Sequence, residues 1–140
     1  MNLSIRTHRV GKMYYTPHFF ILCKGENAGK PMTTPCPNCF VAEFENEVEK
    51  DHAYWVCFGL WQGKIFHRSL VGSVIPFLRV KETKDILINA IARHDCQSPE
   101  FRRTIFKLRQ INALEENILR QASLLKQAKI SIGRLLYKTN

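Results

Sequence analysis

The sequence has no long hydrophobic run, and this absence argues against a membrane-spanning helix. Its longest apolar stretch is the nine residues from Ala53 to Trp61, whereas a helix needs about 20 apolar residues to cross a bilayer. The first twelve residues contain no apolar core of the kind that secretion signals have. We therefore expect a cytoplasmic protein with no membrane partner.

Recognisable catalytic motifs are absent as well. The chain has no GxSxG nucleophile elbow, no HExxH zinc motif and no phosphate-binding P-loop. Its five histidines are scattered and stand in no recognisable catalytic pattern. The sequence therefore predicts a protein that is not an enzyme and needs no cofactor, and we assign no catalytic, cofactor-binding or metal-binding residue.

The five cysteines do not indicate a disulfide framework. An odd number of cysteines in a chain without a secretion signal is typical of reduced thiols. Cys36 and Cys39 have the CxxC spacing of metal and redox sites, but the second pair that a structural zinc usually needs is missing. We interpret the cysteines as buried or loop thiols, and a small zinc or redox protein is the alternative.

Positive charge is what the sequence has in excess. Lys and Arg number 21 against 12 Asp and Glu, which gives a formal net charge of +9. Such a balance favours anionic partners, with nucleic acid first and an anionic membrane surface second. Residues 43–51 interrupt this pattern with acids at alternate positions, which is typical of a strand with one solvated face or of a solvated turn.

The pattern of apolar residues predicts an α+β domain over residues 1–97. Short apolar runs bounded by Pro and Gly predict strands at 18–24 and 38–44, and residues 3–6 alternate as an edge strand does. Residues 52–62 predict a buried helix, with a buried strand as the alternative. Residues 84–94 have the spacing of a short amphipathic helix. We expect a small mixed sheet with packed helices.

Residues 98–140 give the clearest structural signal, that of one long coiled-coil-like helix. Ser98 is a suitable N-cap and Pro99 a suitable first helical residue. Apolar residues then recur about every 3.4 residues from Phe101 to Leu135, close to the 3.5 of a coiled coil. A helix to about Tyr137 would be roughly 55–60 Å long, so part of its stripe should meet another helix; the alternative is a helix lying wholly on its own sheet.

From Ala53 onward, the order of features resembles one half of the DNA-specificity subunit of type I restriction–modification systems. The matching features are residues 53–66, the Gly72-Ser73 loop, residues 85–88 and the helix that Ser98 opens. The resemblance implies a target-recognition domain, a strand at 85–88 in place of the helix expected above, and binding to double-stranded DNA. That family has two such halves per subunit, so it also implies a homodimer through the C-terminal helix or a methyltransferase-like partner.

The whole chain also resembles a family of short, uncharacterised bacterial proteins. The sequences that carry this second resemblance are PNCFV at 37–41, FGLW at 58–61 and GSVIPF at 72–77. It implies no activity.

Basic residues near two glycine-containing loops are the candidate DNA contacts. Two of them flank the turn at 25–30 and three surround the Gly72-Ser73 loop, while Asn27 and Ser73 offer polar groups. Cations of this kind hold phosphates without reading the base sequence. The alternative is a set of solvated cations that share no face. The predicted DNA-binding residues are Lys24, Lys30, Lys64, Arg68, Ser73 and Arg79.

Two further groups of residues could contribute to DNA binding. Basic residues cluster at the start of the long helix, where a solvated helix face explains them equally well. Three aromatic residues in the N-terminal part could stack on bases, although core packing is their commoner use. These groups are Arg102, Arg103, Lys107 and Arg109 on the helix, and Tyr14, Tyr15 and Phe19 among the aromatics. The sequence thus predicts a non-catalytic DNA-binding module, and the alternative is a protein-interaction module acting through the C-terminal helix.

Overall fold

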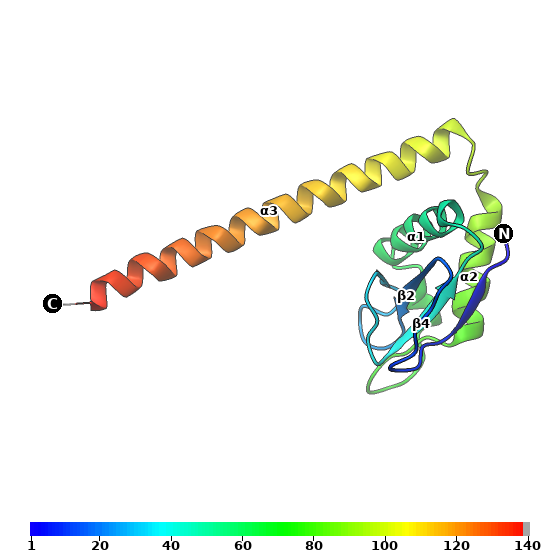
Figure 1. The fold of residues 1–140 in the computed structure, drawn as a ribbon, viewed down its shortest axis with the longest axis horizontal. Helices are drawn as coiled ribbons and strands as arrows, with labels where there is room; N and C mark the ends of the chain where they lie inside the picture. Colours follow the sequence, from blue (N-terminus) through cyan, green and yellow to red (C-terminus); the bar gives the residue numbers. More distant parts are fainter. Residues whose placement is uncertain (139–140) are drawn as a thin grey trace. The chain divides into compact units, whose positions relative to one another are not determined.

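A computed structural model describes residues 1–138 and divides the chain into two compact units, Met1–Phe101 and Arg102–Asn140. The elements, in chain order, are β1 (Ser4–Thr7), β2 (His18–Leu22), β3 (Pro31–Met32), β4 (Cys39–Glu43), α1 (Glu47–Gln62), the short 3₁₀ helix η1 (Phe66–Ser69), α2 (Val80–Arg93) and α3 (Pro99–Tyr137). Figure 1 shows their succession along the chain. The α+β class predicted from the sequence is confirmed.

The first unit is built on a four-stranded sheet with the order β1-β4-β2-β3. Every pair of neighbouring strands is antiparallel, so the expected mixed sheet is wrong. The physical reason is that all four strands precede the first long helix. A parallel pair needs a long crossover connection, usually helical, and no helix lies between these strands. The edge position predicted for β1 is confirmed.

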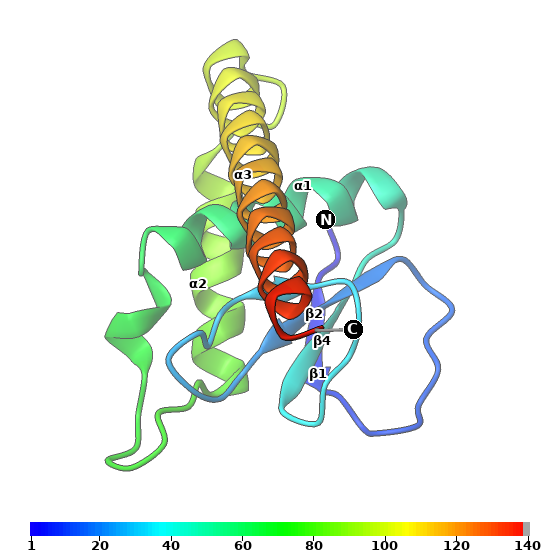
Figure 2. The same cartoon turned by 90° about the vertical axis from the view of Figure 1, so that its left-hand side faces the viewer.

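One face of the sheet forms the main hydrophobic core. Side chains alternate along a strand, so Phe19 and Ile21 of β2 point to this face and are buried, with Phe40 and Ala42 of β4 beside them. Both helices that follow the sheet, α1 and α2, pack on this face and on each other (Figure 2). Burying a Phe or Ile side chain in this core contributes about 1.5–3 kcal/mol to stability.

The opposite face of the sheet is covered by loops rather than by helices. Phe20 of β2 packs there with Val41 and Cys39 of β4, and Tyr14 and Cys36 cover them from two loops. This second cluster is much smaller than the first. It explains why the strand residues read as nearly continuous apolar runs, since both faces of β2 and β4 are buried.

Helix α1 begins five residues earlier than the sequence predicts. Asn46 is its N-cap, and the side-chain oxygen of Asn46 accepts a hydrogen bond from the backbone N–H of Glu49 at 2.9 Å. The acidic residues after Asn46 therefore lie in the first turns of a helix, where the positive end of the helix dipole favours them. The interpretation of 43–51 as an exposed strand is wrong beyond Glu43, where β4 ends, and the predicted helix at 52–62 is confirmed.

Helix α2 confirms the amphipathic pattern of residues 84–94 and extends it back to Val80. Leu87 is fully buried and Ile86 is partly buried against the main core, while Ile88 is exposed. The strand at 85–88 that the restriction–modification resemblance implied is therefore wrong. The physical reason is that burial follows the 3.6-residue period of a helix here and not the two-residue period of a strand.

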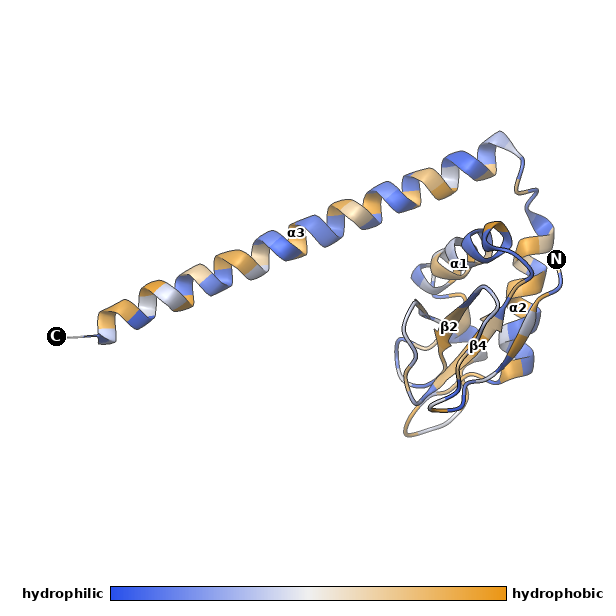
Figure 3. Cartoon of the chain, in the orientation of Figure 1, coloured by the Kyte–Doolittle hydropathy of each residue, from blue (hydrophilic) through white to orange (hydrophobic). Residues whose placement is uncertain are grey.

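The predicted C-terminal helix is confirmed as α3, which begins at Pro99 and ends at Tyr137. Its first turn is capped by Ser98, whose hydroxyl oxygen accepts a hydrogen bond from the N–H of Phe101 at 3.2 Å. None of the residues of α3 is buried, and apolar residues recur along it between polar ones (Figure 3). Among residues 1–138, no helix is both long enough and apolar enough to cross a membrane.

Candidate nucleic-acid interface

The first basic segment is the turn between β2 and β3, residues 23–30, which we call the basic turn. It carries Lys24 and Lys30, both exposed. Gly29 has a φ of +99° and packs on η1 so closely that an added Cβ would lie 2.3 Å from Cδ2 of Phe66. Only glycine tolerates both this backbone conformation and this approach. The basic turn is therefore held directly against η1.

The second basic segment, residues 63–79, runs from the end of α1 through η1 to the start of α2. It carries Lys64, Arg68 and Arg79, which are all exposed. Lys64 has a φ of 57°, and this left-handed residue turns the chain out of α1. Gly63 stands at the C-cap, but its φ is −75°. The left-handed residue that glycine usually supplies is here the lysine.

Hydrogen bonds hold the two basic segments side by side. The contacts are Gly25 N–H to Pro76 C=O at 2.8 Å, Leu78 N–H to Cys23 C=O at 2.8 Å, and the Nε2 of His67 to Glu26 C=O at 3.1 Å. Figure 2 shows the basic turn, in light blue, on the same side of the sheet as the second basic segment, in green. The structure thus brings together the segments that carry all six predicted DNA-binding residues, and we call this part of the first unit the basic end.

The cations of the basic end differ in their surroundings. The Nζ of Lys30 lies 5.5 Å from the centre of the Trp61 ring, a distance at which a cation–π interaction holds the ammonium group. The guanidinium of Arg79 pairs with Glu82 at 3.5 Å. Arg79 is therefore the member of the set whose charge is partly compensated.

The other three cations have no such acidic neighbour. Within residues 1–138, no carboxylate pairs with Lys24, Lys64 or Arg68. Asn27 and Ser73, the two polar residues predicted beside them, are exposed. The arrangement offers an anionic ligand three ammonium or guanidinium groups that already face solvent.

Charge is distributed unevenly within the first unit. The basic turn and the second basic segment hold five basic residues and one acidic residue, whereas 43–51 holds five acidic residues and one basic residue. Helix α1 runs from the acidic stretch to the basic end, a length of about 24 Å. The negative end of the α1 dipole also attracts cations. Of these segments, the basic turn and the second basic segment therefore carry the excess of positive charge, and the start of α1 carries the excess of negative charge.

The predicted stacking aromatics have three different positions. Phe19 is 2% exposed and its ring stacks on that of Phe44 in the main core, so a base-stacking role for Phe19 is wrong. Tyr14 is half-buried, and its hydroxyl lies 3.0 Å from Nδ1 of His8. Tyr15 is 92% exposed, and it is the one of the three whose ring can meet a base.

Sequence reasoning missed a cationic setting around Tyr14. The guanidinium carbon of Arg6 lies 5.8 Å and the Nζ of Lys12 lies 5.5 Å from the centre of the Tyr14 ring. Arg6 also pairs with Glu43 of the neighbouring strand. The signal that was present is the density of basic and aromatic residues between 6 and 15. It did not show that the loop folds back over the sheet.

Three of the five thiols, those of Cys23, Cys39 and Cys57, have raised pKa values and are not activated as nucleophiles. Burial raises the pKa of Cys39 to about 11, and its Sγ donates a hydrogen bond to the carbonyl of Cys36 at 2.9 Å. Burial also raises the pKa of Cys57 and of Cys23. A thiol with a raised pKa is a poor nucleophile at neutral pH. Within residues 1–138, no three His, Cys, Asp or Glu side chains gather as metal ligands would.

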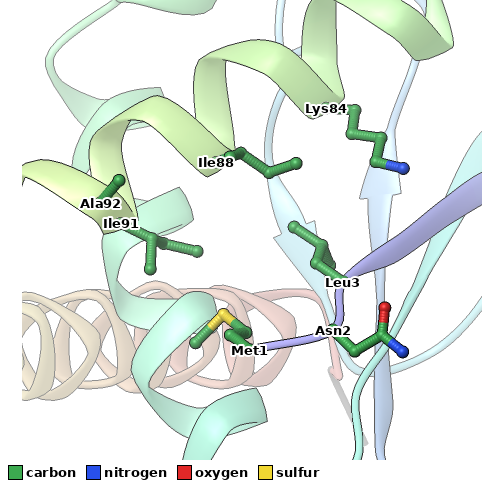
Figure 4. Close-up of a pocket in the computed structure, with 7 residues that line it drawn as sticks. All are labelled: Met1, Asn2, Leu3, Lys84, Ile88, Ile91 and Ala92. Carbon is green, nitrogen blue, oxygen red and sulfur yellow. The ribbon is translucent and has the colours of Figure 1, made fainter.

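A cavity of about 370 Å³ lies elsewhere in the first unit. Figure 4 shows that it is bounded by the N-terminal residues Met1 and Leu3 on one side and by Ile88 and Ile91 of α2 on the other, with Lys84 at one end. It shares no residue with the basic end. Its lining is mainly apolar, with Asn2 and Lys84 as the two polar side chains.

The second unit carries most of the net charge. Residues 102–140 contain nine basic and two acidic residues, whereas residues 1–101 contain twelve basic and ten acidic residues. The helix cluster that the sequence singled out belongs to this second unit, and its members are exposed. These residues are Arg102, Arg103, Lys107 and Arg109.

Taken together, the first unit is a small α+β body with a basic end, and the second is a basic, exposed helix. Residues 5–134 match a family described as a family of unknown function (DUF6943), and the chain belongs to this family. No curated protein and no solved structure matches the chain. The membership agrees with the resemblance to short, uncharacterised proteins. The resemblance to the restriction–modification subunit finds no support among these comparisons.

Proposed function

We propose that this protein is a non-catalytic DNA-binding module and that its basic end contacts the phosphates of a duplex. The observation that carries the proposal is the set of hydrogen bonds that join residues 23–30 to residues 63–79. These bonds place five basic residues from distant parts of the sequence in two adjoining segments.

The same geometry favours contacts to the DNA backbone over contacts to base edges. Lysine and arginine on turns suit phosphates, which position a protein on a duplex without reading its sequence. The five cations lie outside the two long helices: α1 ends at the basic end with Gln62, and α2 begins there at Val80. The exposed Ser73 and Asn27 are the residues with which the module would approach a groove.

Charge reversal at the basic end tests the proposal. We expect Lys64→Glu/Arg68→Glu to weaken binding to a short duplex and to make the plot of log K against log salt concentration shallower by about 2, since each lost phosphate contact removes about 0.9 from the slope. Two single variants provide the matched control, because each makes the same charge change: Arg68→Glu lies at the basic end and Arg93→Glu lies outside it. Arg93 is also an exposed arginine, and it lies at the far end of α2.

The control decides whether the position of the charge matters. If Arg93→Glu weakens binding as much as Arg68→Glu does, net charge alone explains the affinity and the basic end is not the site. If the double variant binds with unchanged affinity and slope while it remains folded, the proposal is wrong.

A second candidate function is a protein-interaction module that acts through α3. The observation that favours it is the exposure of the large apolar residues along this helix, because monomeric proteins seldom leave a continuous apolar stripe in water. The partner would be a second copy or a methyltransferase-like protein. The two functions are compatible, since one belongs to the basic end and the other to α3.

A further inference from the structure

Helix α3 contains a regular seven-residue repeat that begins at Ile111. A heptad repeat of this kind marks a coiled coil, in which positions a and d face the partner helix. The residues at a are Ile111, Ile118, Leu125 and Ile132, and those at d are Leu114, Gln121, Ala128 and Leu135. The six large aliphatic residues among these eight are between 56% and 68% exposed. The seam therefore lacks the partner that its pattern requires.

We propose that the seam is covered by α3 of a second copy of this chain, lying antiparallel, with Ile111 of each copy opposite Leu135 of the other. This inference goes beyond DNA binding and does not depend on it. In this register every a residue between 111 and 132 meets a d residue of the other helix. The helices pair over residues 111–135, a length of about 36 Å.

Side-chain size supports this register. Each small or polar residue of the seam meets a large aliphatic one, as closely packed interfaces require. Ala128 lies opposite Ile118 and Gln121 lies opposite Leu125. The Nε2 of Gln121 already donates a hydrogen bond to Oδ1 of Asn117 on its own helix at 2.6 Å, so its amide is partly satisfied without the partner.

The residues that flank the seam agree with the same register. Leu108 of one helix comes beside Leu136 of the other, and the two copies of Leu124 meet near the two-fold axis. The seam and its flanks then account for eight of the twelve large exposed apolar residues on the described part of α3. An unrelated partner would not require this internal match between the two halves of one helix.

Charge complementarity fixes the direction of the pairing. Antiparallel pairing in this register brings Glu115 of each copy beside Lys129 of the other, and it does so twice because the dimer is symmetric. Neither residue has an opposite charge three or four positions away on its own helix, where intrahelical ion pairs form. Flanking ion pairs of this kind set orientation and partner choice in coiled coils.

A parallel dimer would lose each of these matches. It would stack Gln121 on Gln121 and Ala128 on Ala128, and it would place Lys107, which falls at a d position, against its own copy. It would also align the basic start of one helix with that of the other, where like charges repel. The antiparallel arrangement separates the two starts of α3 by about 70 Å, and Lys107 then lies beyond the paired region.

Disulfide trapping tests the direction and the register. Ile111→Cys and Leu135→Cys are made separately in the full chain, with Cys96→Ser because Cys96 is exposed, and the two variants are mixed and oxidised. We expect the mixture to give the 111–135 link and each variant alone to give little dimer. Links of 111 to 111 or of 135 to 135 at equal or greater yield overturn the proposal.

Sedimentation equilibrium of the unmodified chain, at several concentrations, tests the partner. A dimer is expected, and a monomer at every concentration overturns the proposal whatever happens to DNA binding. Glu115→Lys and Lys129→Glu should each raise the dimer dissociation constant several-fold, and the double variant should restore it. Glu116→Lys is the control, since it makes the same charge change one residue away on the outer face. No restoration in the double variant, or an equal effect of the control, overturns the antiparallel register.

Discussion

Replacing Gly29 by alanine tests the contact that holds the basic turn against η1. Two costs combine at this position. A φ of +99° is unfavourable for alanine by about 1–2 kcal/mol. In addition, the new Cβ would lie 2.3 to 2.9 Å from three side-chain carbons of Phe66, and such overpacking costs about 1–3 kcal/mol. We expect Gly29→Ala to lower the free energy of unfolding by about 2–5 kcal/mol.

Gly25→Ala is the matched control in the same turn. Gly25 has a φ of +90°, but no atom lies within 4 Å of an added Cβ. It should therefore show the backbone cost alone, about 1–2 kcal/mol. The difference between the two variants isolates the contact with Phe66.

Urea denaturation and thermal denaturation, both followed by tryptophan fluorescence, measure this difference in the free energy of unfolding. The probe reports on the first unit because both tryptophans lie on α1. For a unit of about 100 residues, each kcal/mol shifts Tm by about 4–8 °C. Gly29→Ala should therefore melt at least about 4 °C below Gly25→Ala. Equal stability of the two variants would refute the close packing of the basic turn on η1, and with it the placement of the two basic segments side by side.

Other predictions concern titration, thiols and capping. Burial lowers the pKa of His52, so the contribution of His52 to the free energy of unfolding should be fully present above its unfolded pKa of about 6.5. This contribution should be lost as pH falls from that value through the lowered pKa of the folded state. His52→Asn should remove part of this pH dependence in melting curves. At pH 7 an alkylating reagent should modify the exposed Cys96 in the folded protein and reach Cys39 only on unfolding, as peptide mass spectrometry would show; modification of both at equal rates would contradict the burial of Cys39. Asn46→Ala should lower the free energy of unfolding by about 0.5–2 kcal/mol, because the N–H of Glu49 loses its partner; an unchanged denaturation midpoint would contradict the capping role.

The elements with strong local signals could be predicted from the sequence. Helix α3 could be predicted because Ser98 and Pro99 specify its start and an uninterrupted apolar period specifies its continuation, without help from the rest of the fold. Strands β2 and β4 could be predicted because both of their faces are buried, which makes them short apolar runs.

Elements that depend on distant contacts could not be predicted. Strand β3 is two residues long and begins with Pro31, so only its pairing with β2 makes it a strand.

The start of α1 was missed because alternate acids resemble a strand face until Asn46 is recognised as the cap. The antiparallel sheet, by contrast, could have been predicted, because no helix separates the strands that are expected before residue 52.

The candidate site could be predicted in composition but not in construction. The basic residues are visible in the sequence. Their approach to one another depends on the contact between Gly29 and Phe66 and on the bond between His67 and Glu26. Each of these contacts joins residues about 40 positions apart, and no local sequence pattern predicts such a contact.

The salt dependence of duplex binding by the unmodified chain tests the central claim most directly. If the five basic residues of the basic end each neutralise a phosphate, log K should fall linearly with log salt with a slope of about −4.5, a loss of a few hundred-fold between 50 and 200 mM. Failure to bind a duplex at 50 mM salt, or binding that salt leaves unchanged, would contradict it.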